Sequence, residues 1–244
     1  MKRLVVWVVN QLGYAIVPHW RLGTEPAVVR LRELFARRRI DQVIDVGANE
    51  GQFYKLLRRQ VGFTGRIVSF EPVPQLAARL QQRSADDPAW TVHACALGRA
   101  ACELDLNVAR LSVFSSFLPP LADDPSEGGN TVVRTVRVPV RTLDEMFPDA
   151  AALRHTYLKL DTQGFDLEVA AGGEYALRAI PALQTEVSFR PIYEGMPGYQ
   201  QSIGAFERYG FRVGDFFLVS TDRSGIAYEF DCIMLRPADN TAPR

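Results

Sequence analysis

Three acidic residues lie at the carboxyl ends of short apolar runs, and each is followed at once by turn-forming residues. They are Asp45, Glu71 and Asp161. Parallel strands end at one edge of a sheet, and open α/β sheets bind their ligands at that edge. The spacing therefore predicts that these carboxylates share one ligand site.

The turn after the first acid reads Gly-Ala-Asn-Glu-Gly over 47–51. Gly47 and Gly51 permit positive φ and a close backbone approach to a ligand, and the following helix N-terminus offers free N–H groups. The turn lacks the G-x-G-x-x-G pattern of dinucleotide sites, and Glu50 would repel a phosphate. An acid at Asp45 suits a cationic ligand better, such as the sulfonium and ammonium of S-adenosylmethionine. An ordinary strand-to-helix turn is the alternative.

The second acid, Glu71, follows Gly51 by 20 residues. An acid ending the second strand of such a unit can accept two hydrogen bonds from a ribose diol. Adenosyl and dinucleotide ligands both carry that diol, so Glu71 alone does not separate them. A third strand is predicted over 90–95, and Ala96 beyond it is expected near an adenine ring.

Four polar residues are candidates for contacts with a second substrate. Ser116 lies in a long loop, Gln163 follows Asp161, and Arg190 and Tyr193 follow a predicted strand. Long loops inside compact domains are often functional. An exposed serine or arginine and a packed tyrosine are the alternatives.

Composition limits the kind of protein. The chain has 244 residues, 47% of them hydrophobic, and equal numbers of basic and acidic residues. This length suits one large α/β domain, and zero net charge argues against a nucleic-acid partner. The three cysteines show no C-x-x-C spacing, which argues against a zinc ribbon and favours reduced thiols in the cytoplasm.

The elements that must position these residues alternate between strand and helix. A domain over 40–236 is predicted, preceded by an extension over 1–39 that includes a helix over 24–39, and followed by a flexible tail over 237–244. Most strands should be parallel, and the final pair, 211–219 and 227–235, should be antiparallel. The stretch 101–140 interrupts the alternation and is expected to form a hairpin-like flap beside the site.

The first 24 residues contain an apolar run over 4–9 behind Lys2 and Arg3. This run is shorter than the ~20 residues that a membrane-spanning helix needs. A terminal segment packed on the domain or on a partner subunit of a homo-oligomer is one interpretation. A helix over residues 1–20 lying on a membrane surface is the other.

The chain also resembles a known family. The matching strings are IDVGANEG at 44–51, SFEP at 69–72, VPVRTLD at 138–144, LKLDTQG at 158–164, EVS at 186–188 and YEG at 193–195. In this order they resemble the FkbM-like family of class I S-adenosylmethionine-dependent methyltransferases over about residues 40–235.

The resemblance implies a Rossmann-like fold, a mostly parallel seven-stranded sheet with an antiparallel closing strand, and O-methylation of a hydroxyl on a sugar, a glycan or a related metabolite. It also implies a cofactor site, formed by Asp45, Gly47, Asn49, Gly51 and Glu71. Many members of the family carry Glu at the position of Gln163, so a role that needs a charge there does not transfer to this chain.

A hydroxyl is a weak nucleophile and must lose its proton, so a positioned base would help. Asp161 is the first candidate, with helix capping as its alternative role. Glu186 lies in an otherwise apolar strand, where a carboxylate needs a partner or a function. His155 is expected on the surface at the far end of its strand. Asp161 with Glu186 could hold a divalent metal, but no three residues show metal-ligand spacing, so no metal site is predicted.

Two other functions compete with this one. An NAD-linked oxidoreductase could use a similar sheet, although the glycine pattern and the closing strands argue against it. A non-catalytic scaffold or membrane-surface protein is suggested by residues 1–24, although the three acids argue against it.

Overall fold

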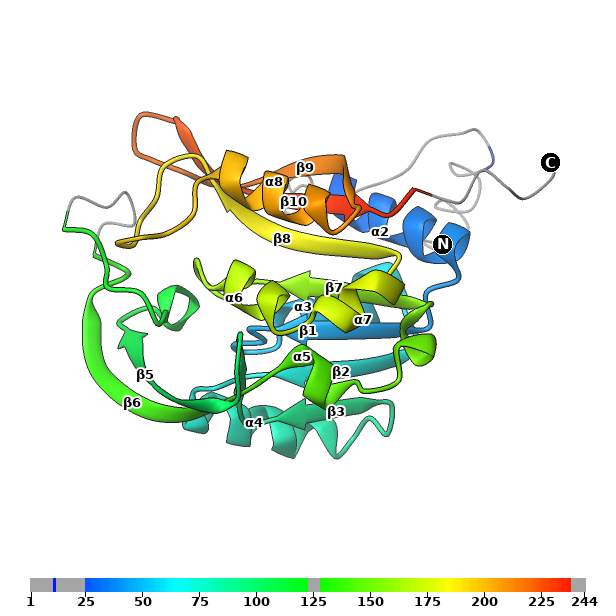
Figure 1. Ribbon diagram of the computed structural model, residues 1–244, viewed down its shortest axis with the longest axis horizontal. Coiled ribbons are helices and arrows are strands. Elements are labelled where there is room, and N and C mark those ends of the chain that lie inside the picture. Colours follow the sequence, from blue (N-terminus) through cyan, green and yellow to red (C-terminus); the bar gives the residue numbers. More distant parts are fainter. Residues whose placement is uncertain (1–10, 12–24, 123–127, 238–244) are drawn as a thin grey trace.

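The computed structural model describes Gln11 and residues 25–122 and 128–237. Its main sheet has seven strands in the order β3-β2-β1-β7-β8-β10-β9 (Figure 1). The strands are β1 (Gln42–Val46), β2 (Arg66–Phe70), β3 (Trp90–His93), β7 (Thr156–Leu160), β8 (Ala182–Ser188), β9 (Arg212–Thr221) and β10 (Ala227–Leu235). β10 is antiparallel to both of its neighbours, and the other paired strands are parallel. The mostly parallel sheet with an antiparallel closing strand is therefore confirmed.

Strand periodicity divides the core between the two faces of the sheet. Ile44 and Val46 contribute to one apolar cluster, and Val43 contributes to the other. Successive strand side chains point to opposite faces, so a strand buried on both sides reads as a continuous apolar run. This is why β1 carries no clear alternation in its sequence, and why Asp45 lies on the same face as Val43.

Helices cover both faces. Leucines of α2 (Glu25–Arg38), the π-helical turn η2 (Leu57–Val61) and α4 (Pro74–Ser84) enter one cluster, beside α3 (Gln52–Leu56). The other cluster receives side chains of α5 (Leu143–Met146), the 3-10 turn η4 (Ala150–Leu153), α6 (Asp166–Ala171), α7 (Glu174–Ala179) and α8 (Tyr199–Arg208). The result is a three-layer α/β arrangement (Figure 1).

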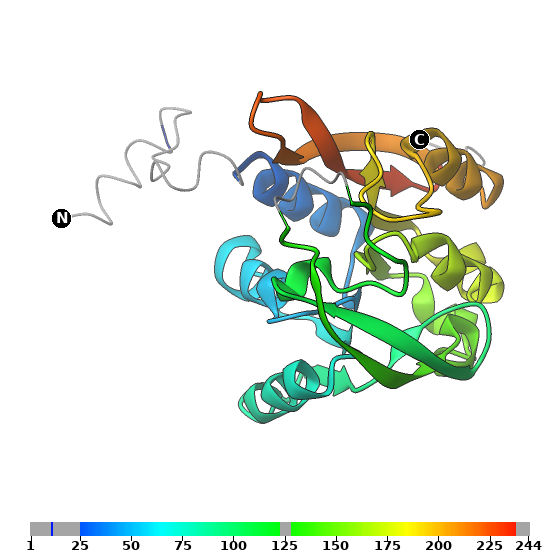
Figure 2. The ribbon, with the colours of Figure 1, turned by 90° about the vertical axis from the view of Figure 1, so that its left-hand side faces the viewer.

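The inserted flap is a sheet of its own. β5 (Cys102–Ala109) pairs antiparallel with β6 (Val132–Arg141), and β4 (Ala96–Leu97) adds to β6 in parallel. The 3-10 turn η3 (Ser112–Phe114) follows β5. Figure 2 shows this curved ribbon, in green, arching past the main sheet. The predicted hairpin is therefore present, but a third strand joins it.

One local prediction needs correction. The strand expected over 90–95 ends at His93, and the chain then turns so that Ala96 and Leu97 pair with the flap. The helix after Gly51 consists of α3 followed by the π-helical turn η2, which ends at Val61.

Every helix in the described part of the chain, which comprises Gln11, 25–122 and 128–237, is too short or too polar to cross a membrane. Apart from Gln11, residues 1–20 lie outside the described residues, so both interpretations of this segment, packing on the domain or a partner and a helix on a membrane surface, remain predictions. Most of the predicted tail also lies outside them.

Candidate active site

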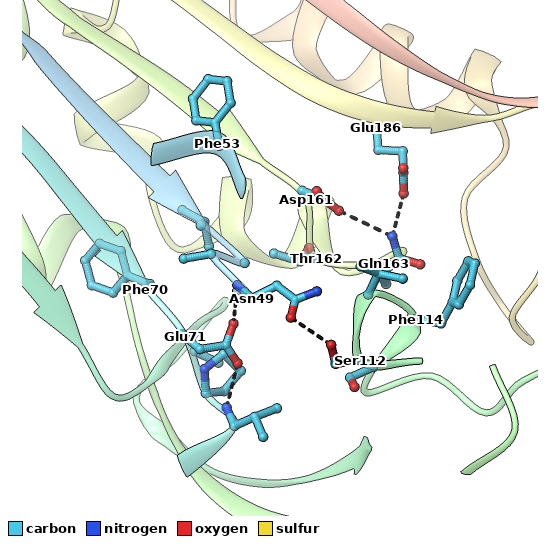
Figure 3. A pocket seen from close by; sticks show the side chains of 18 of the residues that line it. Asn49, Phe53, Phe70, Glu71, Ser112, Phe114, Asp161, Thr162, Gln163 and Glu186 are labelled. Carbon is cyan, nitrogen blue, oxygen red and sulfur yellow. Dashed lines mark hydrogen bonds between the residues drawn. The ribbon is translucent and has the colours of Figure 1, made fainter. Parts of the chain in front are cut away.

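A cavity of about 340 Å³ lies at the carboxyl edge of the main sheet, partly beneath the flap. Strand ends, the glycine turn and η3 all contribute to its wall. Small-molecule sites are typically roughly 300–1,000 Å³ and mostly apolar, with a few polar groups. Figure 3 shows Glu71 on one side of this cavity and Glu186 on the other.

The glycine turn is shaped by close packing against β7. Gly47 has φ +84°, and a Cβ atom at this position would lie 1.9 Å from the carbonyl oxygen of Asp161. Only glycine fits so near a neighbouring backbone. Asn49, in the same turn, also adopts a left-handed conformation, with φ +47°. Left-handed conformations are uncommon for residues other than glycine, and they cluster at functional sites. The conformation of this turn therefore supports a functional role for it.

Glu71 is held by backbone groups. Its Oε2 accepts the Asn49 amide at 2.6 Å, and its Oε1 accepts the Val73 amide at 2.8 Å. The side chain is only 3% exposed, and burial raises the pKa of its carboxyl to about 7, against the two amides. A carboxylate oxygen has two lone pairs, so each oxygen keeps one for a further donor.

The wall around Glu71 is apolar. Phe70, Val73, Ala96, Leu97, Leu106 and Phe117 line it. An apolar wall beside one buried acceptor suits a nucleoside, with the base against the wall and the diol on the carboxylate.

A buried lysine links the glycine turn to the other side of the cavity. The ammonium of Lys159 lies 3.0 Å from Asp161 Oδ2 and 3.3 Å from Asp45 Oδ1, and it donates to the carbonyl of Gly47 at 3.4 Å. Burial lowers the pKa of Lys159, but the charges of Asp161 and Asp45 outweigh that effect and raise it overall. Lys159 is therefore a permanent cation between two carboxylates.

Gln163 connects the acids of β7 and β8. Its Nε2 donates to Glu186 Oε2 at 2.8 Å and to Asp161 Oδ1 at 3.3 Å (Figure 3). Its Oε1 accepts from the hydroxyl of Tyr193 at 2.9 Å. The backbone of Gln163 has φ +53°, so this position, like Asn49, is left-handed.

Glu186 differs from Asp161 in its surroundings. Burial, followed by the charges of Asp161, Glu229 and Asp231, raises the pKa of Glu186 well above its ordinary value. Asp161 instead has Lys159 at its side, and its side chain is 38% exposed. Two nearby acids in unlike environments can take the separate roles of proton donor and proton acceptor. Burial and neighbouring acids favour the protonated form of Glu186, whereas Asp161 lies beside a cation and is more accessible.

Seven predicted site residues line the cavity together. They are Gly47, Asn49, Glu71, Ala96, Asp161, Gln163 and Glu186. Of the three strand-end acids expected to share one site, Glu71 and Asp161 line this cavity.

Asp45 does not line the cavity, so the direct ligand contact predicted for it does not fit the structure. It is fully buried on the face covered by α3, because strand alternation turns its side chain away from the edge. There it pairs with Lys159 and accepts a hydrogen bond from Ser69 at 3.3 Å. Burial raises the pKa of Asp45, and Lys159 opposes that shift.

Four more predicted residues lie outside the lining. Gly51 shapes the turn before α3, with φ +73°. Ser116 is buried and donates to the carbonyl of Gln163 at 2.7 Å. Tyr193 is buried behind Gln163, and exposed Arg190 lies 3.8 Å from Asp222 in the turn between β9 and β10. Ser116 and Tyr193 therefore support the site from behind rather than face it.

Sequence reasoning missed two charged residues of the lining, Lys159 and Glu229. Both interrupt apolar strands, which is the signal that identified Glu186. Applied evenly, the rule that a buried charge needs a partner would have found all three. His155, as expected, is exposed, and its carbonyl accepts from Asp41 and Gln42 at the far end of β7.

One further atom bears on whether the cavity can bind a cofactor that contains a nucleoside. Asn49 Nδ2 is buried and has no hydrogen-bond partner among the described residues, while its Oδ1 accepts from Ser112 at 2.9 Å. A buried donor without a partner is costly and marks a place where a ligand can bind. Across 25–122 and 128–237, His, Cys and carboxylate side chains form no group suited to a metal ion.

Comparison with known proteins gives one family match. The model of the methyltransferase FkbM domain matches residues 45–213, more than half of the chain. No curated protein matches this chain.

Solved structures add similarities of fold. An FkbM methyltransferase from Methylobacillus flagellatus is 18% identical, with a TM-score of 0.50 over 79% of this chain. This chain spans 43% of that protein. The magnesium protoporphyrin IX methyltransferase of Synechocystis, solved with bound S-adenosylmethionine, is 12% identical over 97% of each chain, with a TM-score of 0.47.

Proposed function

The chain belongs to the FkbM methyltransferase family, and we propose that it is an S-adenosylmethionine-dependent O-methyltransferase acting on a hydroxyl of a sugar, a glycan or a related secondary metabolite. The observation that carries this proposal is the pairing of two unlike carboxylates in one cavity. Glu71 is fixed by backbone amides beside an apolar wall, and Asp161 is fixed by side chains on the other side.

The residues of the cavity fit the cofactor. Glu71 would accept the ribose hydroxyls, and the apolar wall that includes Phe70 and Ala96 would take the adenine. The turn at Gly47 and Asn49 would receive the amino-acid end through its backbone and the unpartnered Asn49 Nδ2. When bound, S-adenosylmethionine supplies a methyl group already activated by its sulfonium, so the protein contributes mainly orientation and electrostatics.

The acceptor side supports oxygen as the methylated atom. A hydroxyl must lose a proton as it is methylated, and Asp161 is a carboxylate with a neighbouring cation and an accessible side chain. A positioned base contributes typically about 10²–10⁴-fold to rate. Glu186, whose pKa is raised by burial and by neighbouring acids, would orient the acceptor by donating or accepting a hydrogen bond. Sugars and hydroxylated metabolites offer the neutral hydroxyls that such a wall can bind.

Ligand binding is the first test. We expect S-adenosylmethionine and its demethylated product S-adenosylhomocysteine each to raise the melting temperature in a concentration-dependent way, because ligands that bind only the native state stabilise it. NADH at equal concentration should give no shift. A shift with NADH alone, or with none of the three on folded protein, would contradict the proposal.

The acceptor is then tested by product formation. Methyl glycosides, polyols and hydroxylated aromatic metabolites are incubated with S-adenosylmethionine, and S-adenosylhomocysteine is quantified together with the methylated acceptor. Mass spectrometry should locate the new methyl on oxygen. Methylation found only on nitrogen, carbon or sulfur would retain the cofactor and overturn the O-methyl assignment.

A further inference from the structure

Lys159 joins three parts of the site. It is the penultimate residue of β7, between two buried leucines, and its side chain is only 8% exposed. Its ammonium is within 3.4 Å of Asp161, Asp45 and the carbonyl of Gly47, and it lies 5.6 Å from the centre of the Phe53 ring. One cation thus ties β1, the glycine turn and the cavity wall together.

The charges around Asp161 make this cation important. Asp45 of β1, Asp166 of α6 and Asp231 of β10 each interact electrostatically with Asp161, with Lys159 or with both. Glu71 lies farther along the same cavity. Lys159 is the only Lys, Arg or His among the described residues that line it. Without its ammonium, Asp161 would face like charges, which favours protonation of a carboxyl group.

The same contact fixes the direction of the carboxylate. Lys159 holds Asp161 Oδ2 at 3.0 Å, and the weaker donor Gln163 Nε2 reaches Oδ1 at 3.3 Å. A charge-assisted hydrogen bond is stronger than a neutral one. Asp161 is therefore anchored through one oxygen and presents the other toward Gln163 and Glu186.

We propose that Lys159 is a positioning residue for methyl transfer, whose ammonium places a positive charge beside Asp161 and fixes the oxygen that faces the acceptor. This inference rests on the proposed function. In the step it serves, the bond between sulfur and the methyl carbon breaks, a bond between that carbon and the acceptor oxygen forms, and the hydroxyl proton passes to Asp161. The sulfonium becomes a neutral thioether, so charge and atoms balance.

The test replaces Lys159 by Met in two backgrounds. Lys159→Met alone leaves Asp45 buried and without its cation, which can prevent folding. The double variant Asp45→Asn with Lys159→Met removes that stranded charge and keeps similar volumes. We expect this double variant to fold and to bind S-adenosylhomocysteine like the wild type. Its turnover at pH 7 should fall about 10–100-fold, and the acid limb of its kcat profile should move up by about one pH unit or more, in line with the effect of an adjacent opposite charge.

Two matched variants separate positioning from structure. Asp45→Asn alone retains the Lys159–Asp161 pair, so its acid limb should stay with that of the wild type and its turnover should exceed that of the double variant at least about tenfold. Lys159→Arg keeps the positive charge, so the acid limb of its kcat profile should lie closer to that of the wild type than to that of the double variant. An equal displacement in Asp45→Asn, or a double variant with wild-type rate and profile, would overturn the proposal.

A readout without catalysis keeps this inference distinct from the proposed function. Carbon-13 NMR of aspartate side-chain carboxyls, with the Asp161 resonance assigned through Asp161→Asn, follows its ionisation directly. We expect its titration to move to higher pH in the double variant but not in Asp45→Asn. An unmoved titration would refute the role of Lys159. A moved titration without methyl transfer by the wild type would count against the proposed function alone.

Discussion

The two sides of the cavity hold their carboxylates by different means. Glu71 accepts two backbone amides, from Asn49 and Val73, and both donors lie within or beside strand-end turns. Asp161 is held by the side chains of Lys159 and Gln163. Backbone donors require only that the turns adopt their conformation, whereas side-chain donors require that several strands pack in register. The first side is therefore a rigid binding element, and the second is an adjustable electrostatic one.

The same difference appears in the protonation of the two sides. Burial raises the pKa of Glu71 to about 7, so a proton on this group is exchanged near neutral pH. On the other side, burial and nearby acids raise the pKa of Glu186 well above its ordinary value, while Asp161 has the Lys159 ammonium beside it. We therefore expect binding to depend on Glu71 and turnover to depend on Asp161, and separate measurements can test this division.

The largest expected effect is on turnover. Asp161→Asn keeps the shape of the side chain but removes the base, so kcat for a hydroxyl acceptor should fall by roughly 10²–10⁴-fold. The dissociation constant of S-adenosylhomocysteine, measured by calorimetry, should change less than about threefold, since Asp161 is assigned to the acceptor rather than the nucleoside. Equal losses of binding and turnover would erase the distinction between the two sides.

The next effect is on cofactor binding. Glu71→Ala removes two hydrogen bonds from the ribose to a charged group, at about 1.5 kcal/mol each, so the dissociation constant of S-adenosylhomocysteine should rise by at least about 10²-fold. Glu103→Ala is the control, because Glu103 is an exposed carboxylate of the flap that pairs with Arg137. Nucleoside binding that survives in Glu71→Ala would place the ribose elsewhere.

The pH dependence of binding sharpens the role of Glu71. Below about pH 7 its carboxyl is mostly protonated in the free protein, and binding the diol to a carboxylate then requires release of that proton. The dissociation constant should therefore rise up to about tenfold for each pH unit below 7 and stay level above it. Calorimetry in buffers of different ionisation enthalpy should show proton release at pH 6. Glu71→Gln should bind S-adenosylhomocysteine more weakly, and the rise of its dissociation constant below pH 7 should disappear.

Most of the fold could be predicted from the sequence, and so could the side of the cavity where backbone amides hold Glu71. Apolar runs that end in acids predicted the parallel strands, and Gly47 and Glu71 predicted a nucleoside site at their carboxyl edge. These signals are local, since a turn and a strand end are encoded by neighbouring residues. The addition of β4 to the flap was not predicted, because a strand pair over two residues carries no periodicity.

The other side of the cavity, where side chains hold Asp161, could be predicted only in part. Asp161 was identified because it ends an apolar run at the predicted ligand edge, and Glu186 because an acid is unusual in an apolar strand, but the direction of Asp45 was misjudged. Whether a strand-end acid turns toward the edge or into a face depends on its register with the neighbouring strands. In this protein, Asp45 lies level with Lys159 of β7 and Ser69 of β2, and both bind it from the same face. That pairing is set by tertiary structure and cannot be read from one segment.

The smallest expected effect tests how far the side-chain network extends behind the cavity. Tyr193→Phe removes the hydroxyl whose single hydrogen is shared between two acceptors, Gln163 Oε1 at 2.9 Å and the carbonyl oxygen of Phe114 at 2.7 Å. Loss of a buried hydrogen bond costs about 1–2 kcal/mol in the free energy of unfolding, measured by urea denaturation. Because Gln163 would then be less firmly oriented between Asp161 and Glu186, kcat should also fall, by about threefold to tenfold.

A matched tyrosine shows whether that loss of turnover is specific. Tyr157 is also buried and also donates to a glutamine, Gln184 Oε1 at 3.0 Å, but neither residue lines the cavity. Tyr157→Phe should therefore lower the free energy of unfolding by a similar amount and leave kcat within about twofold of the wild type. If both variants lost turnover equally, general loosening of the sheet would explain the effect. If only Tyr193→Phe lost it, the network that orients Asp161 would extend from β7 through Gln163 to the loop that follows β8.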